Sequence, residues 1–140
     1  MGKINYGRVV LGGLVAGLII NAGEMILNAW ILMKDWEEAM KALNRPDMGG
    51  SGIAVMVALC FGLGILLTWV YAAIRPRFGA GPKTAICAGL TVWVLAYAWT
   101  SLSGMVMDVF PARLLVIGMI WGLFELPISA LAGAWLYREE

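Results

Sequence analysis

The chain has 140 residues, of which 61% are hydrophobic and only 14% are charged, whereas a soluble domain averages about 45–50% apolar and about 25% charged residues. A net charge of +1 argues against a nucleic-acid partner, which requires a basic surface. The absence of histidine excludes histidine-ligated haem and the usual zinc sites. The apolar residues collect in four blocks between short polar segments, which predicts a single membrane domain over residues 1–140.

The first apolar block predicts a membrane-spanning helix over residues 8–33. At 1.5 Å per residue it is roughly 37 Å long, enough to cross a bilayer with some tilt. Gly13 and Gly17 form a small-xxx-small pair, which lets a second helix approach closely. Polar residues spaced i, i+3 and i+7 share one helical face in this block, namely Asn21, Glu24 and Asn28.

A short amphipathic segment follows over residues 35–44. Apolar residues recur in it at i, i+3, i+4 and i+7, beginning at Trp36. Asp35 followed by Glu38 resembles a capping box with Asp35 at the N-cap. This pattern predicts an interfacial helix on the membrane surface, with Trp36 at the level of the lipid headgroups. A structured extramembrane loop packed on the bundle is the alternative.

Three further apolar blocks predict spanning helices over residues 53–74, 84–107 and 112–137. A basic turn rich in proline and glycine, residues 75–83, separates the first two of these helices. The last helix carries a second small-xxx-small pair, Gly118 and Gly122. The predicted fold class is therefore an all-α integral membrane protein, with four transmembrane helices in an up-down bundle and one short interfacial helix after the first.

The distribution of lysine and arginine predicts the orientation in the membrane. An inside N-terminus places six basic residues on the cytoplasmic side, namely Lys3, Arg8, Arg75, Arg77, Lys83 and Arg138. It places four on the other side, namely Lys34, Lys41, Arg45 and Arg113. We therefore expect a multi-pass protein with both termini in the cytoplasm.

Two carboxyl groups, those of Glu24 and Glu125, lie deep in the apolar blocks. Counting along the predicted helices places both of them, together with Tyr97, roughly 13–18 Å from the same membrane face. Other polar residues within a turn or two of that level are Asn21, Asn28, Ser101 and Ser129. The sequence therefore predicts one buried polar layer that binds a ligand or a proton.

Burying an ionisable side chain in a membrane costs roughly 2.5–3.5 kcal/mol. Polar contacts between membrane helices average only about 0.6 kcal/mol, so a purely structural role compensates poorly for two glutamates. Two adjacent carboxyl groups favour sharing a proton, and such a group is able to bind a cation or relay a proton. The leading hypothesis is proton-linked transport or binding of a small solute or cation.

The alternative hypothesis is a non-catalytic accessory subunit, or a module that binds lipid or another hydrophobic ligand. In that case the glutamates are structural, and the glycine faces dock a second copy or a larger membrane complex through Gly13 and Gly17 and through Gly118 and Gly122. No nucleophile with a paired base and no phosphate-binding loop is recognisable. We therefore expect no enzymatic activity, no cofactor and no metal, with the lipid bilayer as the main partner.

Three stretches resemble uncharacterised small four-helix bacterial membrane proteins: residues 9–17 (VVLGGLVAG), 71–79 (YAAIRPRFG) and 132–139 (AGAWLYRE). This resemblance extends over the whole chain and implies a bacterial inner-membrane location. The architecture is also similar to that of small multidrug-resistance transporters, which have four helices, short loops and a glutamate in the first helix. That similarity implies that Glu24 binds protons and cationic drugs. The amphipathic segment and Glu125 depart from the transporter pattern.

Overall fold

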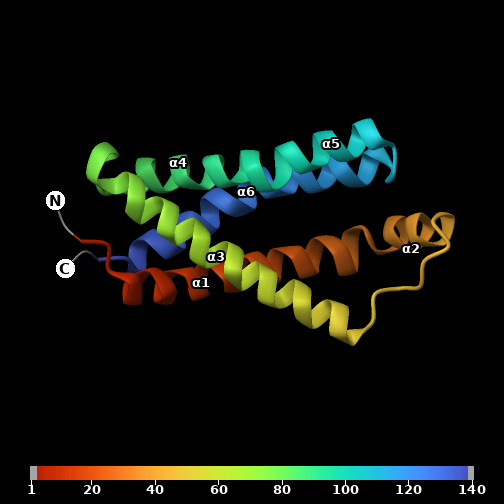
Figure 1. The fold of residues 1–140 in the computed structure, drawn as a ribbon, viewed down its shortest axis with the longest axis horizontal. Coiled ribbons are helices and arrows are strands. Elements are labelled where there is room, and N and C mark those ends of the chain that lie inside the picture. Colours follow the sequence, from red (N-terminus) through yellow and green to blue (C-terminus); the bar gives the residue numbers. More distant parts are fainter. Residues whose placement is uncertain (1–2, 139–140) are drawn as a thin grey trace.

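The computed structural model describes residues 3–138, which are predominantly helical and contain no strand (Figure 1). The elements in chain order are α1 Tyr6–Met25, η1 Ile26–Ile31, α2 Met33–Ala42, α3 Gly50–Phe78, α4 Pro82–Trp93, η2 Val94–Ala98, α5 Trp99–Met107 and α6 Ala112–Leu136. The two η segments are π-helical turns, in which each backbone N–H bonds the carbonyl five residues earlier. η1 continues α1, and η2 joins α4 to α5, without a break, whereas the non-helical Leu32 separates η1 from α2.

Four helical stretches are long and apolar enough to cross a membrane, namely Tyr6–Ile31, Gly50–Phe78, Pro82–Met107 and Ala112–Leu136. Each exceeds the roughly 20 residues that a bilayer requires. The prediction of an all-α fold with four helices able to cross a membrane is therefore confirmed for the described residues. The beginning of α1 and the end of α6 lie at one end of the molecule, and α2 lies at the opposite end (Figure 1).

The connection between α3 and α4 is tighter than the sequence suggests. The expected turn at 75–83 shrinks to three residues, because α3 continues through Pro76 to Phe78. A proline in the last helical turn removes only one donor, and the Gly79 N–H closes the helix on the Arg75 carbonyl at 2.8 Å. The chain then reverses at Gly79 and Gly81, whose positive φ angles of 84° and 139° favour glycine.

The closest helix crossing joins α1 to α3 through glycines. Gly13 lies against Ile65, and Gly17 lies against Phe61. From the other side, Gly64 lies against the backbone of Gly13 and Gly17. The first small-xxx-small pair does bring in a second helix, but that helix is α3 of the same chain, so Gly13 and Gly17 are not open to a partner as the alternative hypothesis expects.

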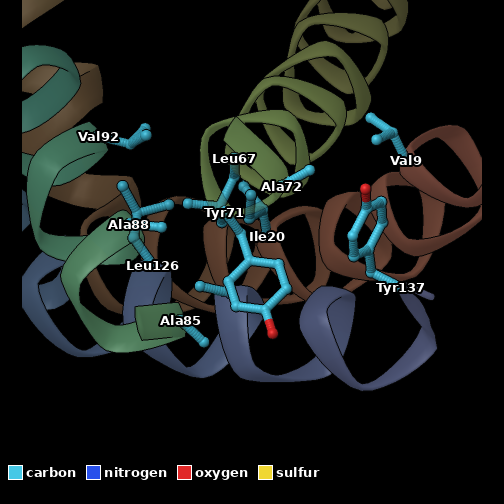
Figure 2. Close-up of a cluster of buried hydrophobic side chains, with 11 residues drawn as sticks. Val9, Ile20, Leu67, Tyr71, Ala72, Ala85, Ala88, Val92, Leu126 and Tyr137 are labelled. Atoms are coloured by element: carbon cyan, nitrogen blue, oxygen red, sulfur yellow. The ribbon is translucent and has the colours of Figure 1, made fainter. Parts of the chain in front are cut away.

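The main core lies where α1, α3, α4 and α6 meet. Figure 2 shows Ile20 of α1 beside Leu67, Tyr71 and Ala72 of α3. The complete buried cluster is Val9, Ile20, Leu67, Tyr71, Ala72, Ala85, Ala88, Val92, Leu126, Ala130 and Tyr137. Four of its members are alanines, whose small side chains let the helix backbones approach closely.

A second cluster packs α2 onto the opposite end of the bundle. It consists of Leu27, Leu32, Ala39 and Leu114. The Trp36 ring stands edge-on against Phe110, with a centroid separation of 5.6 Å and an interplanar angle of 72°. Trp36 therefore packs against the turn before α6, so the segment lies on the bundle as in the alternative, although it is a helix and not a loop.

The predicted N-cap at Asp35 is wrong. The helix begins at Met33, and its N-cap Leu32 makes no side-chain hydrogen bond. Asp35 lies in the first turn, where its Oδ1 pairs with Arg113 Nε at 3.0 Å. The Asp35 carboxylate therefore pairs with Arg113 of α6 and does not cap the helix. No pattern within the segment itself predicts this partner.

Candidate functional site

The centre of the candidate site is Tyr97, which lies between the two buried glutamates. Its hydroxyl oxygen is 2.6 Å from Oε1 of Glu24 and 3.1 Å from Oε2 of Glu125. Glu125 is only 6% exposed, and Glu24 and Tyr97 are half-buried. Neither glutamate forms an ion pair with a basic side chain of residues 3–138, so the carboxyl groups depend on neutral hydrogen-bonding partners.

Neutral donors extend this arrangement on both sides. The Asn28 amide donates to Oε2 of Glu24 at 2.7 Å, and the Trp36 indole donates to Oδ1 of Asn28 at 2.8 Å. On the other side, the Trp121 indole donates to Oε1 of Glu125 at 3.2 Å. We call the resulting chain of side chains the carboxyl network, which comprises Trp36, Asn28, Glu24, Tyr97, Glu125 and Trp121.

Both π-helical turns lie at this network. Asn28 belongs to η1 and Tyr97 to η2. A π-type bond is evident where the Leu32 N–H donates to the Leu27 carbonyl at 2.8 Å, and the Asn28 amide also caps the backbone carbonyl of Glu24 at 3.0 Å. Because π turns are rare and occur frequently at functional sites, their presence on two separate helices marks this region of the bundle.

Two glycines make room for the central groups. A Cβ added to Gly23 would collide with Oε1 of Glu125. A Cβ added to Gly122 would lie 2.5–2.8 Å from three ring carbons of Tyr97. The Glu125 carboxyl therefore rests on the α1 backbone, and the Tyr97 ring rests on the α6 backbone.

The number of hydrogens available to Tyr97 and the two glutamates restricts which of these groups is protonated. A phenol has one hydrogen and can donate it to only one of the two carboxyl groups. The second contact is a hydrogen bond only if that carboxyl carries a proton and donates it to the phenol oxygen. An O–H···O⁻ bond measures about 2.5–2.7 Å, which matches the 2.6 Å contact to Glu24. The geometry therefore fits an ionised Glu24 and a protonated Glu125 that share a single negative charge.

The other residues predicted for the polar layer lie outside the carboxyl network. The Asn21 amide donates to the Gly17 carbonyl at 2.9 Å and to the Val57 carbonyl of α3 at 3.3 Å. Ser101 and Ser129 are buried on α5 and α6, but neither is hydrogen-bonded to a carboxyl group of the described chain. The structure thus brings together Glu24, Asn28, Tyr97 and Glu125 from the predicted set.

The two indole donors of the network, Trp36 and Trp121, are not among the residues predicted from the sequence. Trp121 precedes Glu125 by four residues, so the shared face of one helix was a usable signal. Trp36 was assigned to the lipid headgroups, and its bond to Asn28 depends on how α2 folds back onto η1. Gly23 was also missed, because its contact comes from a helix more than 80 residues away in the sequence.

Fold and site together define a multi-pass membrane protein with a hydrogen-bonded carboxyl pair inside its helix bundle. Comparisons with protein-family models, curated proteins and solved structures found no match to this chain. The carboxyl network is therefore interpreted from its own geometry and chemistry.

Gly122→Ala should disturb the network, whereas Gly118→Ala should not. The new methyl group at 122 meets the Tyr97 ring, but a Cβ at 118, one turn earlier on α6, has nothing within 4 Å. We expect Gly122→Ala to be about 1–3 kcal/mol less stable than Gly118→Ala, the usual cost of overpacking. Reversible denaturation in detergent measures the difference. Equal stabilities would mean that the Tyr97 ring moves aside freely.

Proposed function

We propose that this chain is a small membrane protein that transports or binds a small solute or cation by exchanging a proton at Glu24 and Glu125. The observation that carries the proposal is the position of the Tyr97 hydroxyl within hydrogen-bonding distance of both carboxyl groups. An ionisable residue inside a membrane helix is costly and is functional by default. Here two such residues lie within hydrogen-bonding distance of the same Tyr97 hydroxyl, whose hydrogen can exchange.

The arrangement supports a proton relay with a simple balance. The Glu125 proton moves from Oε2 to the Tyr97 oxygen while the Tyr97 hydrogen moves to Oε1 of Glu24. One O–H bond breaks and one forms at the phenol, so Tyr97 stays neutral. The net result is transfer of one proton from Glu125 to Glu24, with the negative charge moving in the opposite direction.

A cation or cationic solute would compete for the same negative charge. The pair carries one proton in the arrangement that fits the geometry, so binding a cation at the carboxyl groups favours release of that proton. Such competition at one site is a simple way to couple proton and solute movement, because either ligand is excluded when the other is bound. The coupling requires no site beyond the carboxyl network.

We propose the bacterial inner membrane as the location, with successive spans in an up-down order and both termini in the cytoplasm. Support comes from the resemblance noted above and from the excess of lysine and arginine on the side that carries the termini. In this orientation α2 lies at the outer surface, where its exposed polar face meets water or lipid headgroups. Labelling single cysteines at each terminus from either side of the membrane tests this orientation.

Proton titration of the purified protein in detergent tests the function. We expect wild type to exchange a proton between about pH 5 and pH 9 whose titration is shifted or lost in both Glu24→Gln and Glu125→Gln, because each substitution leaves a single carboxyl in the pair. Asp47→Asn is the matched control, since it removes an exposed carboxyl from the link after α2. A cation that binds the pair should release this proton.

If both glutamine variants titrate like the Asp47→Asn control and remain folded, the proton-exchange proposal is wrong. The glutamates would then be structural hydrogen-bonding groups. That outcome favours the accessory-subunit alternative, for which proteins that co-purify with the chain become the next evidence.

A further inference from the structure

The contacts between α2 and the carboxyl network point to a second role for this short helix. Its docked face reaches the network through one side chain, Trp36, whose indole bonds Asn28 at 2.8 Å. Asn28 in turn bonds the Glu24 carboxyl at 2.7 Å. No other element outside the four long helices is hydrogen-bonded into the network within residues 3–138.

The flanking residues and the surface contacts of α2 would allow this helix to move away from the bundle. The helix is preceded by a non-helical residue, Leu32, with φ −105° and ψ 9°, and it is followed by a link in which residues 43–49 are all exposed. Its ion pair to Arg113 is a surface contact, because that arginine side chain is 70% exposed, and such pairs contribute little. The docking of α2 therefore depends mainly on the second hydrophobic cluster and on the bond from Trp36 to Asn28.

The seam between α2 and the turn before α6 is incompletely packed. A groove of about 400 Å³ lies there, lined by Asp35, Glu38, Ala39, Ala42, Leu43, Asp108, Val109, Phe110, Pro111 and Arg113. Opening along this seam would expose Asn28, and beyond it the Glu24 carboxyl.

The Asn28 side chain links the docking of α2 to the charge of the Glu24 carboxyl. Its amide nitrogen donates to both the carboxyl and the backbone carbonyl of Glu24, which turns its oxygen toward the Trp36 indole. A hydrogen bond to a carboxylate is roughly twice as strong as one to a neutral acceptor. An ionised Glu24 therefore fixes Asn28 in the orientation that Trp36 requires, and a protonated Glu24 fixes it less firmly.

We propose that α2 is a lid over the Asn28 end of the carboxyl network, and that protonation of Glu24 favours its opening through Asn28 and Trp36. This inference rests on the proposed proton exchange and adds the regulation of access to it. By linkage, a lid that opens on protonation also raises the proton affinity of the network when it is open. Proton uptake and access from the α2 side would then occur together.

Other ionisable groups face these contacts and have to be separated from Glu24. Around the network they are Glu125, Tyr97 and the Cys60 thiol of α3. At the seam they are Asp35, Glu38, Asp108 and Arg113. Asp35 is the main competitor, because protonating it would break its pair with Arg113 and loosen the lid by a different route.

Thiol labelling measures the opening directly. In full-length protein with Cys60→Ala and Cys87→Ala, Ala39→Cys places a thiol on the buried face of α2, where Ala39 is 4% exposed. Ala42→Cys, at an exposed position of the same helix, reports the intrinsic reactivity at each pH. The ratio of their labelling rates with a water-soluble maleimide follows the fraction of open lid.

We expect this ratio to rise as the pH falls, and Glu24→Gln to hold it at the high value at every pH. Trp36→Phe should raise it about 2- to 10-fold, as expected for one lost hydrogen bond. Asp35→Asn should also raise it but should preserve the pH dependence.

The lid proposal is overturned if Ala39→Cys does not label, if the ratio is independent of pH, or if the pH dependence survives Glu24→Gln. It is also overturned if only Asp35→Asn removes that dependence. The comparison of wild type with the two glutamine variants in the proton titration requires no movement of α2, so failure of the lid and failure of the proposed function give different results.

Discussion

Gly64→Ala should destabilise the protein by about 2–3 kcal/mol relative to Gly62→Ala, toward the upper end of the usual cost of overpacking. A Cβ at position 64 would overlap the backbone of Gly13 and would lie 2.6 Å from the Gly17 Cα atom. These are backbone atoms, which have no alternative rotamer, so the whole α1–α3 crossing would have to widen.

Gly62→Ala is the matched control for this prediction. It lies on the same helix, and a Cβ there has nothing within 4 Å. Both substitutions gain about 1 kcal/mol of intrinsic helix propensity, so that gain cancels when the two variants are compared. Loss of helical circular dichroism during denaturation in detergent measures both stabilities. Equal stabilities would contradict the close packing of α1 on α3.

The four membrane helices are predictable because length and apolarity are local properties of a sequence. The constant rise of a helix also made it possible to place Glu24, Tyr97 and Glu125 at similar depths before any contact was known. Depth, however, says nothing about rotation around the helix axis. Ser101 and Ser129 were predicted at this level, yet neither is hydrogen-bonded to a carboxyl group.

The polar face expected on the first helix is divided between two sets of partners. Asn21 and Asn28 would share one face of a regular helix, but η1 begins between them, at Ile26. Asn21 bonds α3 at the Val57 carbonyl, whereas Asn28 bonds Glu24 and Trp36. Which neighbouring helix each side chain meets is not encoded in the helical repeat, so this division could not be predicted.

Tyr97→Phe should lower proton transfer through the protein by about 100-fold or more, the scale of a lost acid–base group. The phenyl ring keeps the packing against Gly122 but removes the oxygen that lies between the carboxyl groups. Without that oxygen the proton of Glu125 has no acceptor on the way to Glu24. Proteoliposomes that enclose a pH-sensitive dye measure the transfer after an imposed pH jump.

Tyr71→Phe is the control for loss of a buried phenol. Its hydroxyl accepts the Gly81 N–H, at 3.3 Å, and within residues 3–138 it is not hydrogen-bonded to either glutamate. Both variants lose hydrogen bonds worth about 0.5–1.5 kcal/mol each, so a comparable modest loss of stability is expected in each. Only the Tyr97 variant should lose proton transfer.

The stability and transfer measurements together decide what Tyr97 does. A structural role predicts that proton transfer follows the fraction of folded protein, so that both tyrosine variants behave alike. A relay predicts that Tyr97→Phe remains folded and inactive, with each glutamate still able to titrate by itself, because the carboxyl groups persist while their connection is lost. If Tyr97→Phe transfers protons as fast as Tyr71→Phe, the two glutamates exchange protons through another route and the relay is wrong.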